Sequence, residues 1–228
     1  MVAVATGSDA SGDATALQRR TYGDGCAVAH ALDLIGERWA LLVVRELLFG
    51  PKRFTDLQAG VPNARPNVLS QRLRELEQSK VIQRRRLGPP ARAWVYELTD
   101  HGRDLEPVVV HLGRWGRHSP FLQHDGQVGV DSLMLALKSH FDPTKCQDFE
   151  ATYLIAFDDD LFTARISGGR LAISRGEPHD PNVAIHTDTK TFRALIIEGQ
   201  RPSRARREGR LEMIGDADAF NRLLDAVT

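Results

Sequence analysis

The chain has 228 residues, of which 42% are hydrophobic and 26% are charged, values typical of a globular protein with a buried core. The absence of a run of about 18 apolar residues excludes a membrane-spanning helix, and the start lacks the basic flank and apolar stretch of a signal peptide. Cys26 and Cys146 lie 120 positions apart, which excludes a disulfide framework and a paired-thiolate zinc site. We therefore expect a soluble, cytoplasmic protein with no metal and no cofactor.

The formal net charge of zero conceals an uneven distribution of charge. Residues 1–120 contain 17 basic and 13 acidic residues, whereas residues 121–228 contain 13 basic and 17 acidic residues. Residues 51–94 alone contain ten Lys and Arg against three acidic residues, a net charge of +7. A basic field of this density favours a polyanionic partner over an ordinary solvated face.

The first 20 residues are mostly small and polar, which predicts a disordered tail. Apolar residues at helical spacing then predict four helices, with the approximate bounds 26–36, 37–49, 54–59 and 66–79. Two strands joined by a Gly-Pro turn and a closing helix follow, at 81–87, 93–99 and 100–115. In the second strand, Trp94, Tyr96 and Leu98 alternate and are expected to face inward.

The fourth helix separates apolar residues from polar ones. Leu69, Leu73 and Leu76 fall on the side expected to face the core, and the opposite side carries amides, a hydroxyl and a guanidinium but no acid. Such side chains can read base edges in the major groove, because Arg pairs with guanine and Asn or Gln with adenine. A basic hairpin can contact phosphates beside it, so the order of elements predicts a winged helix-turn-helix. The candidate DNA-binding residues are Arg53, Arg65, Asn67, Ser70, Gln71, Arg74, Arg84, Arg86 and Arg92.

Several motifs in residues 22–118 follow the order of one known family; they are Cys26–Val28, Ala31–Trp39, Leu41–Leu47, Arg53–Leu57, Val68–Glu77 and Tyr96–Gly102. Together they resemble the HxlR family of bacterial winged-helix regulators. The resemblance implies a homodimeric DNA-binding transcription factor, paired through its first and last helices, on an inverted-repeat site in double-stranded DNA. An apolar stripe on the last helix supports this pairing, and the candidate dimerisation residues are Val28, Leu32, Leu105, Val109 and Leu112.

The second half has a different order of elements, with predicted bounds of 130–141 (helix), 150–157, 161–166, 170–174 and 183–187 (strands), 189–198 (helix) and 211–214 (strand). A last helix capped by Asp216 completes an α+β layer. This half resembles the sterol carrier protein-like lipid-binding fold over about residues 130–228, through its strand 180–187, its helix ended by Gly199 and its segment 209–216. The resemblance implies an apolar cavity, with candidate lining residues Leu133, Leu137, Phe192, Ile196 and Phe220.

Three features each allow two interpretations. The acids 158–160 suit a solvated turn better than a metal site, because three adjacent carboxylates do not converge on one ion. Cys26 either packs at a dimer contact or senses oxidants and electrophiles, since a helix N-terminus favours the thiolate. The basic run 201–210 is either a solvated or partner-contacting loop or an auxiliary phosphate contact.

The sequence thus predicts an α+β protein with a tail (1–20), a winged helix-turn-helix domain (21–120) and a sterol carrier-like domain (121–228). The predicted function is that of a homodimeric transcriptional regulator, not an enzyme, which a hydrophobic small molecule modulates. The alternative is a carrier of hydrophobic ligands whose first half serves mainly for dimerisation. The acid-free outer face of the fourth helix argues against the carrier, because dimerisation does not need a basic helix face.

Overall fold

The computed structural model describes residues 21–122, 126 and 128–227, so the predicted tail lies outside the described residues. The chain divides into one unit that ends at Glu37 and a second that begins at Arg38. In the first unit, α1 (Ala27–Ile35) follows Cys26 and ends at Gly36, as the sequence predicts. The Thr21 hydroxyl and the Tyr22 amide both donate to the carboxylate of Asp33, at 3.0 and 2.9 Å, which holds the segment before α1 against that helix.

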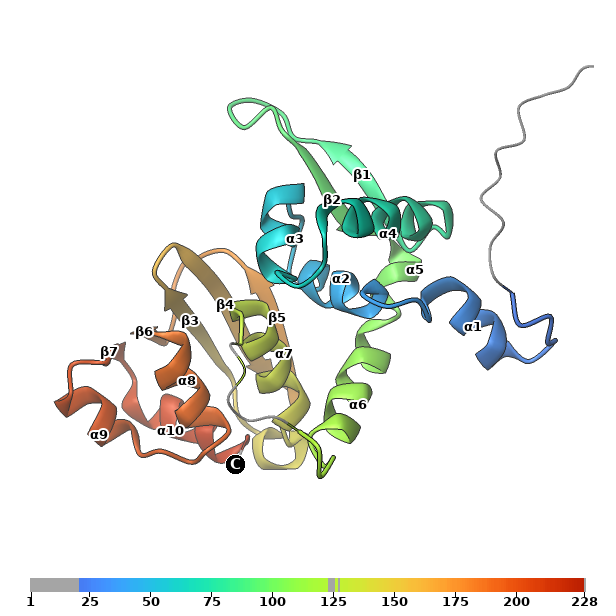
Figure 1. Ribbon diagram of the computed structural model, residues 1–228. Helices are drawn as coiled ribbons and strands as arrows, with labels where there is room; N and C mark the ends of the chain where they lie inside the picture. The colour runs from blue at the N-terminus through green and yellow to red at the C-terminus, as the bar shows by residue number, and fades with distance from the viewer. Residues whose placement is uncertain (1–20, 123–125, 127, 228) are drawn as a thin grey trace, which may run out of the picture. The chain divides into compact units, whose positions relative to one another are not determined.

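The second unit begins with the remaining elements of the helix-turn-helix (Figure 1), which are α2 (Ala40–Leu47), α3 (Phe54–Gly60), α4 (Pro66–Gln78), β1 (Ile82–Arg86) and β2 (Trp94–Leu98). The two strands pair antiparallel, with Ile82 opposite Leu98. Their core contains the three leucines of α4 that the sequence assigns to it, together with Val43, Val44, Leu47, Leu57, Val81 and Val95. Trp94 does not join this core, because it lies toward the far end of the hairpin and is 49% exposed.

The closing helix of this half is two helices rather than the single one predicted over 100–115. They are α5 (Asp100–Arg103) and α6 (Glu106–Gly116), and Pro107 lies in the first turn of the second. Proline has no N–H to donate to the carbonyl four residues earlier, so the helix has to restart there. The short α5 turns the chain closely past Val81, because an added Cβ on Gly102 would lie 2.0 Å from the Val81 carbonyl oxygen.

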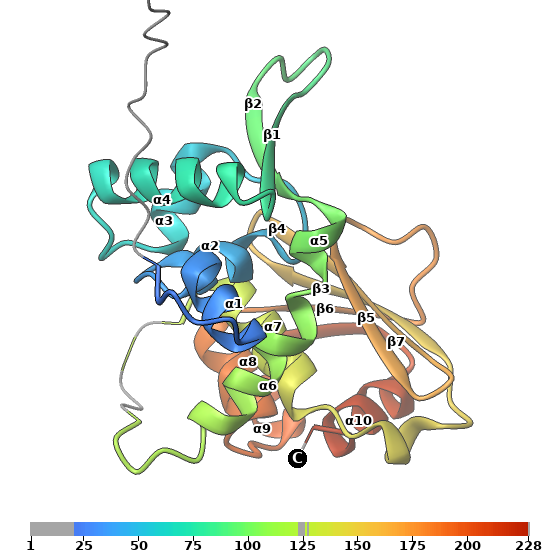
Figure 2. The same ribbon diagram turned by 90° about the vertical axis from the view of Figure 1, so that its right-hand side faces the viewer.

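The C-terminal part is a five-stranded sheet with helices on one face (Figure 2), in agreement with the predicted α+β class. Its strand order is β5-β4-β3-β6-β7, and only the β3–β6 pair is parallel. The strands are β3 (Ala151–Phe157), β4 (Asp160–Ser167), β5 (Arg170–Arg175), β6 (Val183–Thr187) and β7 (Leu211–Gly215). Alternate side chains such as Phe162, Ala164 and Ile166 are buried toward the helices, as the two-residue period of a strand requires.

The covering helices are α7 (Val130–His140), α8 (Thr189–Ile196) and α10 (Ala217–Asp225). Asp216 caps α10 as predicted, because its carboxylate accepts from the amides of Asp218 and Ala219 at 2.9 and 3.0 Å. The basic run that the sequence suggests to be loop-like contains a further helix, α9 (Pro202–Arg207), with proline in its first turn. Among the described residues, no helix is both long and apolar enough to cross a membrane.

A chain of alternating charges joins the helix-turn-helix elements to the C-terminal part. Glu46, in α2, pairs with Arg45 at 2.7 Å and with Lys52 at 2.6 Å. Lys52 also pairs with Asp131, in α7, at 2.5 Å. Asp131 accepts from Arg175 of β5 at 2.8 Å, and Arg175 in turn pairs with Asp160. Phe49 also packs in the C-terminal core, where its ring contacts the Phe162 ring edge-on with 6.1 Å between the ring centroids.

Candidate nucleic-acid interface

Helix α4 presents the polar face that the sequence predicts. Pro66 starts the helix, and the buried Leu69, Leu73 and Leu76 orient it against α2 and β1. Asn67, Gln71 and Arg74 are exposed on the opposite side, and Ser70 is half-buried beside them. Arg65, which precedes the helix, is also exposed. The fold therefore places an amide, a second amide and a guanidinium on one solvent-facing surface, as major-groove reading requires.

The neighbourhood of this face includes an acid that the sequence pattern places off it. The Gln71 side-chain amide donates to Glu75 at 2.9 Å, and the buried Arg72 also pairs with Glu75. Arg72 further donates to the Arg38 carbonyl at 3.1 Å. Arg72 therefore fixes Glu75, and Glu75 orients the Gln71 amide, which would have to exchange this bond for any bond to another acceptor.

The β1–β2 hairpin has arginines on both faces, but their environments differ. Arg84 lies over the Trp94 ring at 4.6 Å and near the Tyr96 ring at 5.9 Å. Arg85 instead pairs with Glu97 at 3.0 Å, and this hydrogen bond and charge raise the pKa of Arg85 and lower that of Glu97. Arg86 is exposed, and its side chain has no hydrogen bond or ion pair in the described part of the chain. Arg84 and Arg86 thus remain available to a phosphate, whereas the charge of Arg85 is compensated internally.

Arg53 and Arg92, the remaining predicted DNA-contacting residues, are also exposed. Arg53 precedes α3, where its backbone amide donates to Asp56 at 2.9 Å, and Arg92 lies in the hairpin turn with a φ of +41°. All nine candidates therefore lie in the helix-turn-helix and the hairpin, and only Ser70 is partly covered. The alternating pattern of the second strand predicts Trp94 in the core, so it did not indicate that the Trp94 ring lies under Arg84.

The residues expected at a dimer interface separate into two groups. Val28 and Leu32 on α1 are 67% and 43% exposed, and Leu112 on α6 is 45% exposed. Val109 is only 5% exposed, so it belongs to the interior of its own chain, and Leu105 is half-buried. The outer face of α6 also exposes Val108 and Trp115, which share the helical spacing of Leu112.

Cys26 is exposed and lies at the N-terminus of α1. Hydrogen bonds from the backbone amides of Val28 and Ala29 lower the pKa of its thiol. Cys146 differs, because it is buried and desolvation raises the pKa of its thiol. The described residues contain no cluster of His, Cys, Asp and Glu that could hold a metal ion.

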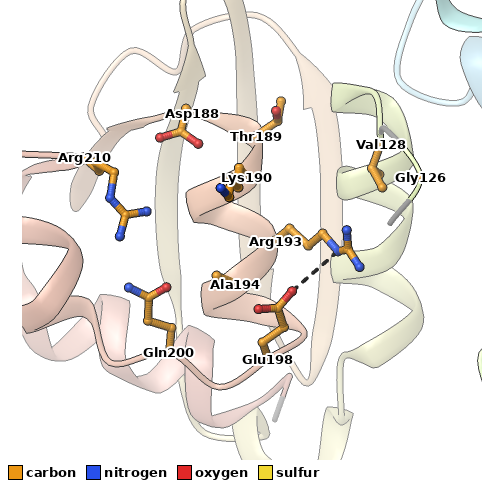
Figure 3. Close-up of a pocket in the computed structure, with 10 residues that line it drawn as sticks. All are labelled: Gly126, Val128, Asp188, Thr189, Lys190, Arg193, Ala194, Glu198, Gln200 and Arg210. Atoms are coloured by element: carbon orange, nitrogen blue, oxygen red, sulfur yellow. Dashed lines mark ion pairs between the residues drawn. The ribbon is translucent and has the colours of Figure 1, made fainter. Parts of the chain in front are cut away.

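The five residues expected to line an apolar cavity are all in the packed core of the C-terminal part. Leu133, Leu137 and Phe192 are 0% exposed, and Ile196 and Phe220 are 1% exposed. Two pockets in the second unit have other linings, which include charged residues. A pocket of about 480 Å³ lies beside the ion pairs of Lys52 with Glu46 and Asp131. A larger one, of about 1000 Å³ (Figure 3), is lined by Gly126, Val128, Asp188, Thr189, Lys190, Arg193, Ala194, Glu198, Gln200 and Arg210.

Known proteins match part of the chain. Residues 34–123 match the model of the HxlR-like helix-turn-helix family. The uncharacterized HTH-type transcriptional regulator YvaP of Bacillus subtilis (strain 168) is 38% identical over 85 residues, which cover 37% of this chain and 79% of YvaP. The HTH-type transcriptional regulator YodB of the same strain is 34% identical over 85 residues, covering 37% of this chain and 76% of YodB.

A solved structure of the redox regulator HypR in its oxidized form is 31% identical, with a TM-score of 0.40, and the match covers 42% of this chain and 100% of HypR. The match to YvaP covers most of that protein and supports the same assignment as the family model. The chain therefore belongs to the HxlR-like helix-turn-helix family.

Proposed function

We propose that this protein is a sequence-specific transcriptional regulator that binds double-stranded DNA as a homodimer and responds to a small molecule bound by its C-terminal half. One observation carries the proposal. The exposed Asn67, Gln71 and Arg74 of α4 share a face next to a hairpin whose Arg84 and Arg86 are uncompensated. This arrangement supplies base-reading groups and phosphate contacts together, which a carrier of hydrophobic ligands would not need.

The homodimer rests on the exposed apolar residues of α1 and α6. Single exposed apolar side chains are common on proteins, but Val108, Leu112 and Trp115 recur on one helix. A two-fold dimer of reading helices requires an inverted-repeat site, with half-site centres about one or two duplex turns apart.

The proposed small molecule is assigned to the C-terminal half, whose pockets indicate its chemistry. Its sterol carrier-like character and its separation as a domain over 121–228 are predictions, as is a hydrophobic effector. The prediction of a hydrophobic effector depended on five apolar residues that are packed in the core. None of the five lines the pocket of about 480 Å³ or the pocket of about 1000 Å³. The chemistry of the larger pocket therefore offers a better guide to the effector than the apolar helices do.

Selection of bound sequences from a random DNA pool tests the proposal directly. Gln71→Ala should relax the base preference and cost about 1–3 kcal/mol at the affected position, because a bidentate base contact is lost. Gln78→Ala is the matched control, since Gln78 is exposed at the C-terminal end of the same helix, away from the N-terminal part that contacts bases. Equal base preferences for the wild-type protein and the Gln71 variant would place the reading surface elsewhere.

A further inference from the structure

The pocket of about 1000 Å³ is built on the outer side of α8 (Figure 3). Asp188 caps this helix by accepting from the Thr191 amide at 2.7 Å, and Phe192 and Leu195 bury its inner side. Lys190 and Arg193 therefore lie on the outer side, and the small Ala194 leaves space between them and the next segment.

The end of α8 brings a polar side chain back to this space. Gly199 has a φ of +65°, a conformation that glycine adopts without strain, and it reverses the chain after the helix. The backbone amide of Gln200 then donates to the Ala194 carbonyl at 2.9 Å. This bond places Gln200 at the edge of the pocket, opposite Lys190 and Arg193.

Positive charge is concentrated around the pocket. Residues 188–210 contain seven Lys and Arg against three acidic residues, although residues 121–228 as a whole contain 13 against 17. Glu208 pairs with both Arg204 and Arg210, and Glu198 lies 3.7 Å from Arg193. The ammonium group of Lys190 has no ion pair or hydrogen bond within the described residues. Arg193 and Arg210 therefore already have acidic partners, whereas the charge of Lys190 is uncompensated among the described residues, and the pocket favours a negative charge next to Lys190.

Two further polar groups point to the same class of ligand. The Gln200 side-chain nitrogen is buried and has no hydrogen-bond acceptor in the described part of the chain. A buried donor without an acceptor is costly, and because Gln200 also lines the pocket, a rotation of its side chain would let a ligand oxygen satisfy this donor. Arg210 donates to the Thr191 hydroxyl at 2.9 Å, so its guanidinium is already held against α8 before any ligand arrives.

We propose that this pocket binds a small organic anion, a carboxylate or a phosphate ester. Lys190 would neutralise its charge, Arg193 and Arg210 would add to the positive field beside it, and the Gln200 amide would donate to one of its oxygens. A cavity of this volume accommodates a ligand of metabolite size. The inference goes beyond the proposed DNA-binding function, because it assigns the C-terminal half a polar ligand in place of a hydrophobic one.

Calorimetric titration of the full chain, without DNA, tests the site separately from the proposed regulation. Citrate and glucose 6-phosphate represent the two kinds of anion, and glucose is the uncharged control. We expect at least one anion to bind below about 10 mM and glucose not to bind. Lys190→Ala should weaken that binding about tenfold, the loss expected for a charge-assisted hydrogen bond. Arg206→Ala removes an exposed arginine of α9 that does not line the pocket, and should change the affinity less than about twofold.

Gln200→Leu separates a binding role from a structural one. Because the side-chain nitrogen that it removes is buried and has no acceptor among the described residues, the variant should keep or raise the melting temperature of the ligand-free protein. It should nevertheless weaken anion binding about threefold or more, since a neutral hydrogen bond is lost. The proposal is overturned if neither anion binds below about 10 mM, or if Arg206→Ala and Lys190→Ala weaken binding equally, which would indicate diffuse surface attraction. Anion binding that leaves DNA affinity unchanged would support the site and refute only its regulatory use.

Discussion

Lys52→Met is the substitution whose effect the structure predicts most sharply. The Lys52 ammonium lies between Glu46 at 2.6 Å and Asp131 at 2.5 Å, and each of the three side chains is less than 10% exposed. Methionine has a similar length but no charge, so the variant leaves two buried carboxylates without their shared cation. Removal of one partner from a buried pair costs about 3–5 kcal/mol. Arg45 and Arg175 still contact the two acids, so we expect the lower part of that range.

The pH dependence of the loss in free energy of unfolding gives a second, independent check on the Lys52→Met prediction. Burial raises the pKa of Asp131, and the charge of Lys52 opposes that rise. Without Lys52, the pKa of Asp131 in the folded protein rises further, and the carboxyl group takes up a proton more readily as the pH falls. The protonated form is neutral and no longer needs the cation, so the difference in stability from the wild type should be larger at pH 8 than at pH 5.

Urea denaturation followed by circular dichroism at both pH values measures this difference. Arg103→Met is the control, because the Arg103–Asp100 pair is exposed and contributes little to stability. A loss below about 1 kcal/mol for Lys52→Met, or a larger loss at pH 5 than at pH 8, would refute the reasoning.

Three further predictions follow from the exposed surfaces. Arg86→Ala should reduce the slope of log binding constant against log salt concentration by about one unit. Arg85→Ala should change this slope less, because Glu97 already pairs with Arg85. Fluorescence anisotropy across a salt series measures both slopes. Leu112→Asp should shift the sedimenting species from dimer to monomer. Ile214→Asp is the control, because it alters an apolar residue of β7 that is 61% exposed, and it should cause no shift. Equal shifts for the two variants would argue against an α6 interface. Cys26 should react with iodoacetamide at a lower pH than an ordinary cysteine, because its lowered pKa increases the thiolate fraction; a reaction profile centred at the ordinary thiol pKa would contradict this.

The link between Lys52 and Asp131 also bears on regulation. It connects the residues just before α3 with the first turn of α7, and the pocket of about 480 Å³ lies beside it. Because α3 and α4 together form the helix-turn-helix, we expect this link to provide a route from the C-terminal part to α4. Reduced DNA affinity of the Lys52→Met protein, under conditions where it is still folded, would support this route, since Lys52 is buried and cannot contact DNA itself.

The sequence by itself determined the features that depend on neighbouring residues. The apolar spacing of Leu69, Leu73 and Leu76 defines both the buried face and the exposed polar face of α4, because the period of a helix is a local property. The cap at Asp216 and the stop at Gly36 likewise depend on residues within one helical turn. The motifs of the first half sufficed to identify its family, which the comparisons confirm.

Only the tertiary structure decided which of several equally apolar residues are covered. Val109 is buried while Val108 and Leu112 are exposed, because the packing of α6 against α7 selects one side of the helix. Lys52 and Asp131 are 79 positions apart, and Lys190 and Gln200 line the same pocket because a glycine reverses the chain between them. No spacing pattern records such pairs, since their approach results from the packing of whole helices and strands rather than from the conformation of adjacent residues.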